Sequence, residues 1–205
     1  MIPKRPHQRS RWLAACLVFC CGGGTAPFGL RLPLRLASAA IAKDEITQLP
    51  GYARPLPSRQ YSGYLRVPGD HGCSKYYHYW FVESEGDPST DPVALWLNGG
   101  PGSSSLIGLL TENGPWQTDE ESLRSPLPWG SAGQTVPQLF RRTHGWQRAA
   151  SVIWLESPAG VGFSYCDYPL NASTGKPQFP CTANDTSTAV DNHNVLQAFF
   201  TGFPE

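Results

Sequence analysis

Residues 96–116 contain the residue types and spacing most suited to chemistry, and they read WLNGGPGSSSLIGLLTENGPW. Gly99, Gly100 and Gly102 follow an apolar run, and residues without a Cβ atom allow a second molecule to approach the backbone N–H groups. We therefore expect this segment to present backbone amides to a substrate. The sequence has no GxSxG motif that would place a nucleophilic serine nearby.

No other residue supplies a clear nucleophile or base. Ser164 lies in GVGFSYC, which lacks the second glycine of a nucleophile elbow, and Ser103–Ser105 lack a strand leading into a sharp turn at the right position. The histidines considered are His71, His78, His144 and His193, and none lies in a catalytic motif. Because a lone histidine is more often a core or surface residue than a base, we expect no member of a catalytic triad in this chain.

Four apolar segments predict strands. Residues 61–67 and 76–82 are rich in aromatic and β-branched residues and flank turn residues, which predicts a β-hairpin. Residues 93–98 and 150–156 are apolar without alternation, which predicts strands buried on both faces. Buried strands joined by a long connection indicate a parallel sheet with both faces covered.

Two segments predict helices. Residues 105–111 have helical spacing but are short, and residues 186–201 predict a longer helix with Thr186 or Ser187 as its N-cap. The expected apolar side of the longer helix comprises Val190, Val195, Leu196, Phe199 and Phe200. Residues 117–143 are polar and contain proline and glycine, so we expect a surface excursion there.

The order of these elements is typical of the start of an α/β-hydrolase fold. A leading hairpin is followed by a buried strand, a glycine-rich loop, an excursion, a second buried strand and a helix. In that fold, the loop after the third strand donates one N–H group to the oxyanion hole.

Composition excludes several other classes of protein. The chain has 205 residues, enough for one domain or part of a larger one, and its 21 Gly and 20 Pro form no repeat. Residues 41–205 carry 10 Lys/Arg against 16 Asp/Glu. A mildly acidic body does not suggest nucleic acid or an anionic membrane as a partner.

Residues 1–39 have the pattern of a targeting segment. Residues 4–11 are basic, residues 12–21 are apolar but too short to span a bilayer, and Ala37-Ser38-Ala39 fits a signal peptidase site. We predict entry into the secretory pathway and no stable membrane insertion after removal of this segment. Two alternatives stay open: cleavage near residues 22–25, and an organelle transit segment in FGLRLPLRLASAA.

The cysteines and sequons of residues 40–205 agree with an exported protein. Cys166 and Cys181 could form a disulfide, which leaves Cys73 without a partner. No CxxC motif occurs here, so we predict no zinc site or other metal site. Asn171 and Asn184 begin N-glycosylation sequons in a polar segment.

The motifs together resemble the serine carboxypeptidase family, of the cathepsin A and carboxypeptidase Y type. WLNGGPG (96–102) and ESPAGVGFSY (156–165) match its two N-terminal signatures. SGYLRV, HYWFVES and FFTGFPE also fit in the same order, and the likeness covers residues 46–205. The resemblance implies an α/β-hydrolase with a Ser–Asp–His triad and no cofactor. Such enzymes remove C-terminal residues from peptides, typically in acidic lysosomes or vacuoles.

The resemblance also implies roles for individual residues. The amide of Gly100 would be one oxyanion-hole donor. Asn98, Gly99 and Glu112 would hold the free carboxylate of the peptide's last residue, with Trp96 close by. The family places another carboxyl opposite Glu112. Because these groups and the substrate carboxylate cannot all be ionised in a dry pocket, at least one must carry a proton.

Glu156, the first residue of the second signature, could suggest an acid–base residue. We interpret it as structural, bracing the loop that precedes Gly160 and Gly162.

The family's nucleophile lies in a GESYAG motif that follows FFxxFPE, and its triad Asp and His lie later still. We therefore interpret this chain as the N-terminal part of such an enzyme, inactive alone. We expect an uncovered apolar edge on the 93–98 strand and an uncovered core face on the 186–201 helix. Ser103 stands where the family usually has cysteine, which would remove one disulfide near the site.

The predicted function is a serine-type carboxypeptidase acting on peptides or proteins with a free C-terminus, in a secreted or lysosomal or vacuolar location. One alternative is a non-catalytic binding protein of the same fold. Another is a related acyltransferase or hydroxynitrile lyase, although Asn98 and Glu112 together favour peptide acids. The sequence predicts no oligomeric state.

Overall fold

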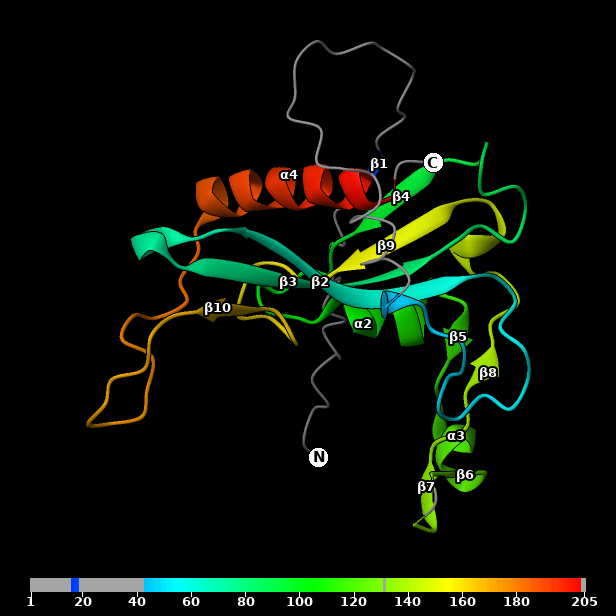
Figure 1. Cartoon of the computed structure of the whole chain (residues 1–205). Helices are drawn as coiled ribbons and strands as arrows, with labels where there is room; N and C mark the ends of the chain where they lie inside the picture. Colours follow the sequence, from blue (N-terminus) through cyan, green and yellow to red (C-terminus); the bar gives the residue numbers. More distant parts are fainter. Residues whose placement is uncertain (1–15, 19–42, 131, 204–205) are drawn as a thin grey trace, which may run out of the picture.

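The computed structural model describes residues 16–18, 43–130 and 132–203 (Figure 1). In chain order, the elements are β1 (Cys16–Val18), β2 (Gln60–Pro68), η1 (Asp70–Gly72), β3 (Ser74–Val82), β4 (Val93–Trp96), α2 (Ser105–Ile107), η2 (Gly108–Glu112), β5 (Trp116–Gln117), α3 (Glu120–Arg124), β6 (Leu127–Trp129), β7 (Gln134–Val136), β8 (Phe140–Arg141), η3 (Trp146–Arg148), β9 (Ser151–Leu155), β10 (Tyr165–Asp167) and α4 (Asp185–Gly202). A six-stranded mixed sheet lies at the centre, beside two small two-stranded sheets.

The predicted hairpin and the predicted parallel pair are both confirmed. β2 and β3 pair antiparallel from Gln60–Val82 to Pro68–Ser74. β4 and β9 are parallel neighbours, and β3 lies antiparallel on the other side of β9. The carboxyl ends of β4 and β9 therefore lie at the same edge of the sheet, where open α/β sheets bind their ligands.

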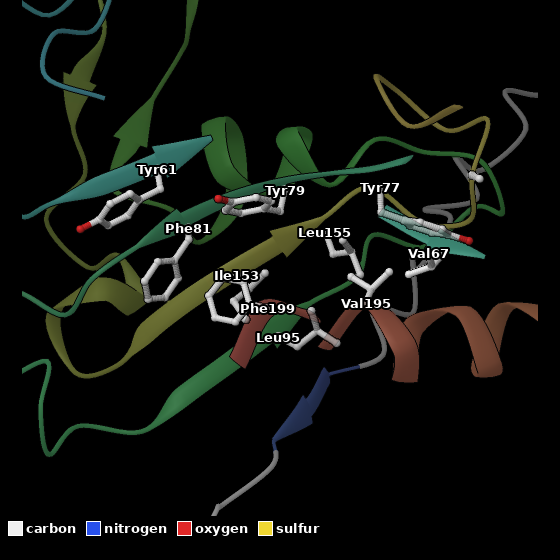
Figure 2. Close-up of a cluster of buried hydrophobic side chains, with 11 residues drawn as sticks. Tyr61, Val67, Tyr77, Tyr79, Phe81, Leu95, Ile153, Leu155, Val195 and Phe199 are labelled. Atoms are coloured by element: carbon white, nitrogen blue, oxygen red, sulfur yellow. The ribbon is translucent and has the colours of Figure 1, made fainter. Parts of the chain in front are cut away.

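Helix α4 covers one face of this sheet (Figure 1), and Figure 2 shows the core between them. Successive side chains of a strand point to opposite faces, so every second residue of β3 and β9 reaches α4. Phe81 and Ile153 pack here with Phe199 of α4, and all three are at most 6% exposed. The other labelled residues of this core are Tyr61, Val67, Tyr77, Tyr79, Leu95, Leu155 and Val195.

The short helices α2 and η2 lie on the opposite side of the sheet from α4 (Figure 1). Trp96 and Trp154, paired across β4 and β9, pack there with the fully buried Leu109 of η2. Coverage of both faces explains why these two strands are apolar without alternation.

A buried ion pair joins α4 to the sheet. The carboxylate of Asp191 accepts hydrogen bonds from the ammonium of Lys75 (2.9 Å) and the hydroxyl of Tyr77 (2.8 Å). Lys75 and Asp191 are each only 5% exposed. Buried charges need such partners, so the pair fixes the position of α4 against β3.

The structure corrects the predicted start of the long helix. Helix α4 begins at Asp185, and its N-cap is Asn184 instead of Thr186 or Ser187. The side-chain oxygen of Asn184 accepts a hydrogen bond from the Ser187 amide (2.9 Å), and the Ser187 hydroxyl accepts one from the Asn184 amide (2.9 Å). This reciprocal capping box satisfies two amides that a helix start would otherwise leave free.

The predicted apolar side of α4 is only partly correct. Val195 and Phe199 are buried, whereas Val190 is 54% exposed and Phe200 is 43% exposed. The helix contacts the sheet along Asp191, Val195 and Phe199, which lie four residues apart on one side. Val190 and Phe200 lie off that line.

The expected uncovered surfaces are corrected only in part. In the full chain, β1 pairs antiparallel with β4, with Cys16 opposite Trp96 and Val18 opposite Ala94, so this edge has backbone partners from within the predicted targeting segment 1–39. Val195 and Phe199 of α4 insert against the sheet, whereas Val190 and Phe200 stay exposed.

The two long connections have structure of their own. Residues 117–143 form an excursion that includes α3 and the short strands β6 to β8. A disulfide between Cys166 and Cys181 closes a loop that starts in β10, and Cys73 is a free thiol among the described residues. None of the described helices is long and apolar enough to cross a bilayer.

Candidate functional site

The glycine-rich loop, residues 98–105, begins at the carboxyl edge of the sheet just after β4. The amide of Asn98 donates a hydrogen bond to the hydroxyl of Ser105 (3.1 Å), and that hydroxyl donates one to the carbonyl of Leu155 (2.6 Å). Both ends of the loop are therefore fastened to each other and to the end of β9.

Gly100 lies exposed in the middle of this loop. Its φ angle is +155°, and a Cβ atom there would lie 2.9 Å from the Gly102 nitrogen and 3.0 Å from the Ser103 nitrogen. The turn is thus closed too tightly for a side chain at this position. The Gly100 amide donates to no acceptor within the described residues, and a free amide can donate to a bound oxygen atom.

The side chains of Trp96 and Asn98 are in direct contact. The indole N–H of Trp96 donates a 2.9 Å hydrogen bond to the side-chain oxygen of Asn98. Because an indole N–H can only donate, it fixes the amide oxygen toward Trp96 and leaves the NH₂ group as the free donor. An NH₂ group held in this way is suited to binding a carboxylate.

Glu112 is less closely tied to these residues. It is exposed and ends η2, a π-helix whose first residue, Gly108, packs against the indole of Trp96. No hydrogen bond or ion pair joins Glu112 to Trp96 or Asn98 within the described part of the chain. The structure thus brings Trp96 and Asn98 into contact, with Gly99 and Gly100 next in the chain, whereas Glu112 has no such contact.

Glu156 is fully buried directly after β9 and connects three segments. One carboxylate oxygen accepts from the Ser104 hydroxyl; the other accepts from the Phe163 amide (2.8 Å) and bonds the imidazole Nδ1 of His78 (3.0 Å). Burial disfavours the charged carboxylate, but the hydrogen bonds from His78, Ser104 and Phe163 outweigh it and lower the pKa of Glu156.

His78 also bonds a serine on its other side. Its Nε2 lies 2.9 Å from the Ser62 hydroxyl, so Ser62, His78 and Glu156 have the bond pattern of a serine–histidine–acid triad. His78 is only 7% exposed, however, and the ring centroids of Tyr64 and Phe163 lie 5.4 and 5.3 Å from that of its imidazole. These rings shield it from substrate, so we interpret the three residues as a structural link.

Sequence reasoning missed His78 and Ser104 as partners of Glu156. The sequence separations are 78 and 52 residues, and neither partner lies in a motif that names the other. The available signal was Glu156 itself, an acidic residue that begins a segment containing Gly160 and Gly162.

No group of three or more His, Cys, Asp or Glu side chains within the described ranges could hold a metal ion. The site residues described above offer hydrogen bonds from oriented amides and hydroxyls.

Comparison with known proteins gives one consistent result. Residues 50–205 match the family described as serine carboxypeptidase. The chain is 43% identical over 187 residues to the lysosomal protective protein of Mus musculus, covering 90% of this chain and 34% of that protein. It is 41% identical over 176 residues to serine carboxypeptidase-like 20 of Arabidopsis thaliana, covering 86% and 31%. The chain thus spans about a third of the length of these relatives.

A solved structure agrees in fold. The crystal structure of a prohormone-processing carboxypeptidase from Saccharomyces cerevisiae matches 80% of this chain and 33% of its own chain, with a TM-score of 0.60 and 21% identity. Together with the family match, this similarity confirms the predicted arrangement for the N-terminal part of an α/β-hydrolase.

Proposed function

Since the chain belongs to the serine carboxypeptidase family, we propose that residues 96–112 form its oxyanion and carboxylate-binding subsites. The observation that carries this proposal is the free, exposed amide of Gly100 two residues after the oriented side chain of Asn98. Both lie at the carboxyl edge of the sheet, where ligands of this fold class bind.

The chemistry is acyl transfer. A serine hydroxyl, which this sequence does not supply in a recognisable motif, adds to the last peptide carbonyl, and the carbonyl oxygen becomes negative. The Gly100 amide stabilises that oxygen, and one such donor contributes about 3 kcal/mol in a working protease. The C–N bond then breaks as the departing amine takes the proton that the serine hydroxyl gave up, and water hydrolyses the acyl-enzyme to the shortened peptide acid and restores the serine hydroxyl.

The free carboxylate of the substrate is the second feature recognised. The NH₂ group of Asn98 and the amide of Gly99 donate to it, and Glu112 completes the subsite from the end of η2.

A titration tests this proposal directly. The 15N-labelled chain is titrated with an N-blocked dipeptide and with the matching dipeptide amide at pH 5, while the Asn98 NH₂ and Gly99 and Gly100 amide signals are followed by NMR. We expect the acid to shift these signals and the amide not to do so. Equal shifts with both ligands, or no shifts with either ligand, would overturn the proposal.

We also propose that the chain travels through the secretory pathway and carries glycans on Asn171 and Asn184. Both residues are exposed, and both use their side-chain oxygen to accept local amides, which leaves the nitrogen free for a sugar. The disulfide between Cys166 and Cys181 is typical of an oxidising compartment. Mass spectrometry after peptide N-glycosidase treatment tests this proposal: an Asn-to-Asp mass change is expected at both sites.

A further inference from the structure

Ser104 joins the glycine-rich loop to a buried carboxylate. Its hydroxyl donates to Glu156 and also accepts a hydrogen bond from the Leu106 amide (3.2 Å) at the start of α2. One side chain therefore fixes both the end of the loop and the helix turn that follows it. Its neighbour Ser105 is bonded separately to the carbonyl of Leu155.

The carboxylate of Glu156 is itself held rigidly. The amide of Phe163 and the imidazole of His78 fix its second oxygen, and the backbone of Gly162 lies so close that a Cβ atom would overlap the carboxylate. Because these partners fix the Glu156 side chain, it moves little and can hold the glycine-rich loop in one position. Its position is set by β3, by the end of β9 and by the 157–164 segment.

We infer that Glu156 is a positioning residue for the oxyanion loop, acting through Ser104 to keep the loop amides aimed at the substrate carbonyl. The inference rests on the proposed function of that loop. It assigns Glu156 a task beyond bracing its own segment, because the carboxylate links the two signature loops into one unit.

The link responds to pH in a defined direction. Among the described residues, His78 is the one titratable side chain bonded to Glu156. The other partners of the carboxylate are the Ser104 hydroxyl from the glycine-rich loop and the Phe163 amide from the 157–164 segment. The folded pKa of Glu156 is lowered, so its stabilising contribution is present above the ordinary glutamate pKa of about 4.3 and is lost as the pH falls through the lower folded value. The loop therefore stays ordered at pH 5.

Hydrogen–deuterium exchange of the full chain tests the inference, with Glu156→Gln and Ser104→Ala as the variants. Glu120→Gln is the matched control, because that carboxylate is exposed and lies on α3. We expect both variants to raise exchange in peptides covering residues 98–105 by about tenfold, as on losing one hydrogen bond to a charged group. Exchange in peptides from α4 should not change in either variant, and Glu120→Gln should leave exchange in residues 98–105 unchanged.

The pH profile separates positioning from general stability. Protection factors for residues 98–105 should hold from pH 7 to 5 and fall below pH 4 in the wild type, whereas Glu156→Gln should show a lowered and flat profile. Unchanged loop exchange in both variants, or an equal increase in α4, would overturn the inference. If Glu156→Gln does not fold, Ser104→Ala decides the result.

The dipeptide titration keeps the two claims apart. Loosening of the loop without any dipeptide binding would reject the proposed function and leave the link between Glu156 and Ser104 standing. Dipeptide binding together with unchanged hydrogen exchange of residues 98–105 in both variants would reject only the link between Glu156 and Ser104.

Discussion

The indole nitrogen of Trp96 lies 2.9 Å from the side-chain oxygen of Asn98 and donates a hydrogen bond to it. Trp96 itself packs against Gly108 of η2 and makes a T-shaped contact with Trp146, with 5.4 Å between the ring centroids. The orientation of the Asn98 amide is thus determined by packing beneath the loop, and a free NH₂ group is available before any ligand arrives.

Trp96→Phe should weaken binding of a blocked dipeptide acid about fivefold, because the Asn98 amide loses the hydrogen bond that orients it. The titration at pH 5 described above measures this change. Trp129→Phe is the control, since Trp129 lies on β6 in the excursion. An unchanged dissociation constant for Trp96→Phe would show that the indole does not set the amide orientation.

Gly100→Ala should destabilise the protein more than alanine at a glycine in open space. Gly72 has a φ of +73° and no atom within 4 Å of an added Cβ, so Gly72→Ala costs only backbone strain, about 1 kcal/mol. Gly100→Ala adds close contact with the backbone nitrogens of Gly102 and Ser103, and we expect about 2–3 kcal/mol. Urea unfolding of the two variants measures the difference, and equal values would mean that the loop relaxes freely.

The sequence was sufficient wherever the signal lies within one segment. The 61–67 and 76–82 segments predicted the hairpin because their aromatic and β-branched residues flank turn residues, and β2 and β3 pair as expected. The apolar runs at 93–98 and 150–156 do not alternate with polar residues, which predicted buried parallel strands. In the structure these strands are parallel neighbours and are covered on both faces. Each strand is shorter than its apolar run by two residues.

Features that depend on distant partners could not be predicted in this way. His78 lies 78 residues from Glu156 in sequence, and Lys75 lies 116 residues from Asp191. Sequence spacing carries no information about such pairs until the sheet is assembled. The sequence marks Asn184 only as the start of a sequon, because the capping box depends on a backbone turn as well as on the residue types.

Asp191→Ala should be strongly destabilising, by about 3–5 kcal/mol, because it leaves the charge of Lys75 buried without a partner. The double variant Lys75→Met, Asp191→Leu should recover most of this loss, since no uncompensated charge remains. Urea unfolding at pH 7 measures both. A double variant as unstable as Asp191→Ala would indicate that packing, and not charge, is what the single change disrupts.

The same pair predicts a loss of stability at alkaline pH. Burial disfavours the charged form of Lys75. The hydrogen bond to Asp191 and the charge of that carboxylate outweigh the effect of burial, so the pKa of Lys75 is raised. The contribution is therefore fully present below the ordinary lysine pKa of about 10.4 and is lost as the pH rises through the higher folded value. Thermal unfolding followed from neutral pH to above about pH 10.4 should show this loss only at the alkaline end in the wild type, and Lys75→Met should lack this alkaline loss.

Asn184→Ala should lower the free energy of unfolding by about 1 kcal/mol, because the Ser187 amide loses its acceptor at the start of α4. Asn184→Asp should retain stability, since aspartate caps equally well and its charge is favourable at a helix N-terminus. Asn171→Ala is the matched control: Asn171 accepts the Ser173 and Thr174 amides in an exposed loop, so we expect less than about 0.5 kcal/mol. Urea unfolding of unglycosylated protein measures all three, so that no glycan contributes. Similar losses for Asn184→Ala and Asn171→Ala would contradict the capping role, because only Asn184 begins a helix.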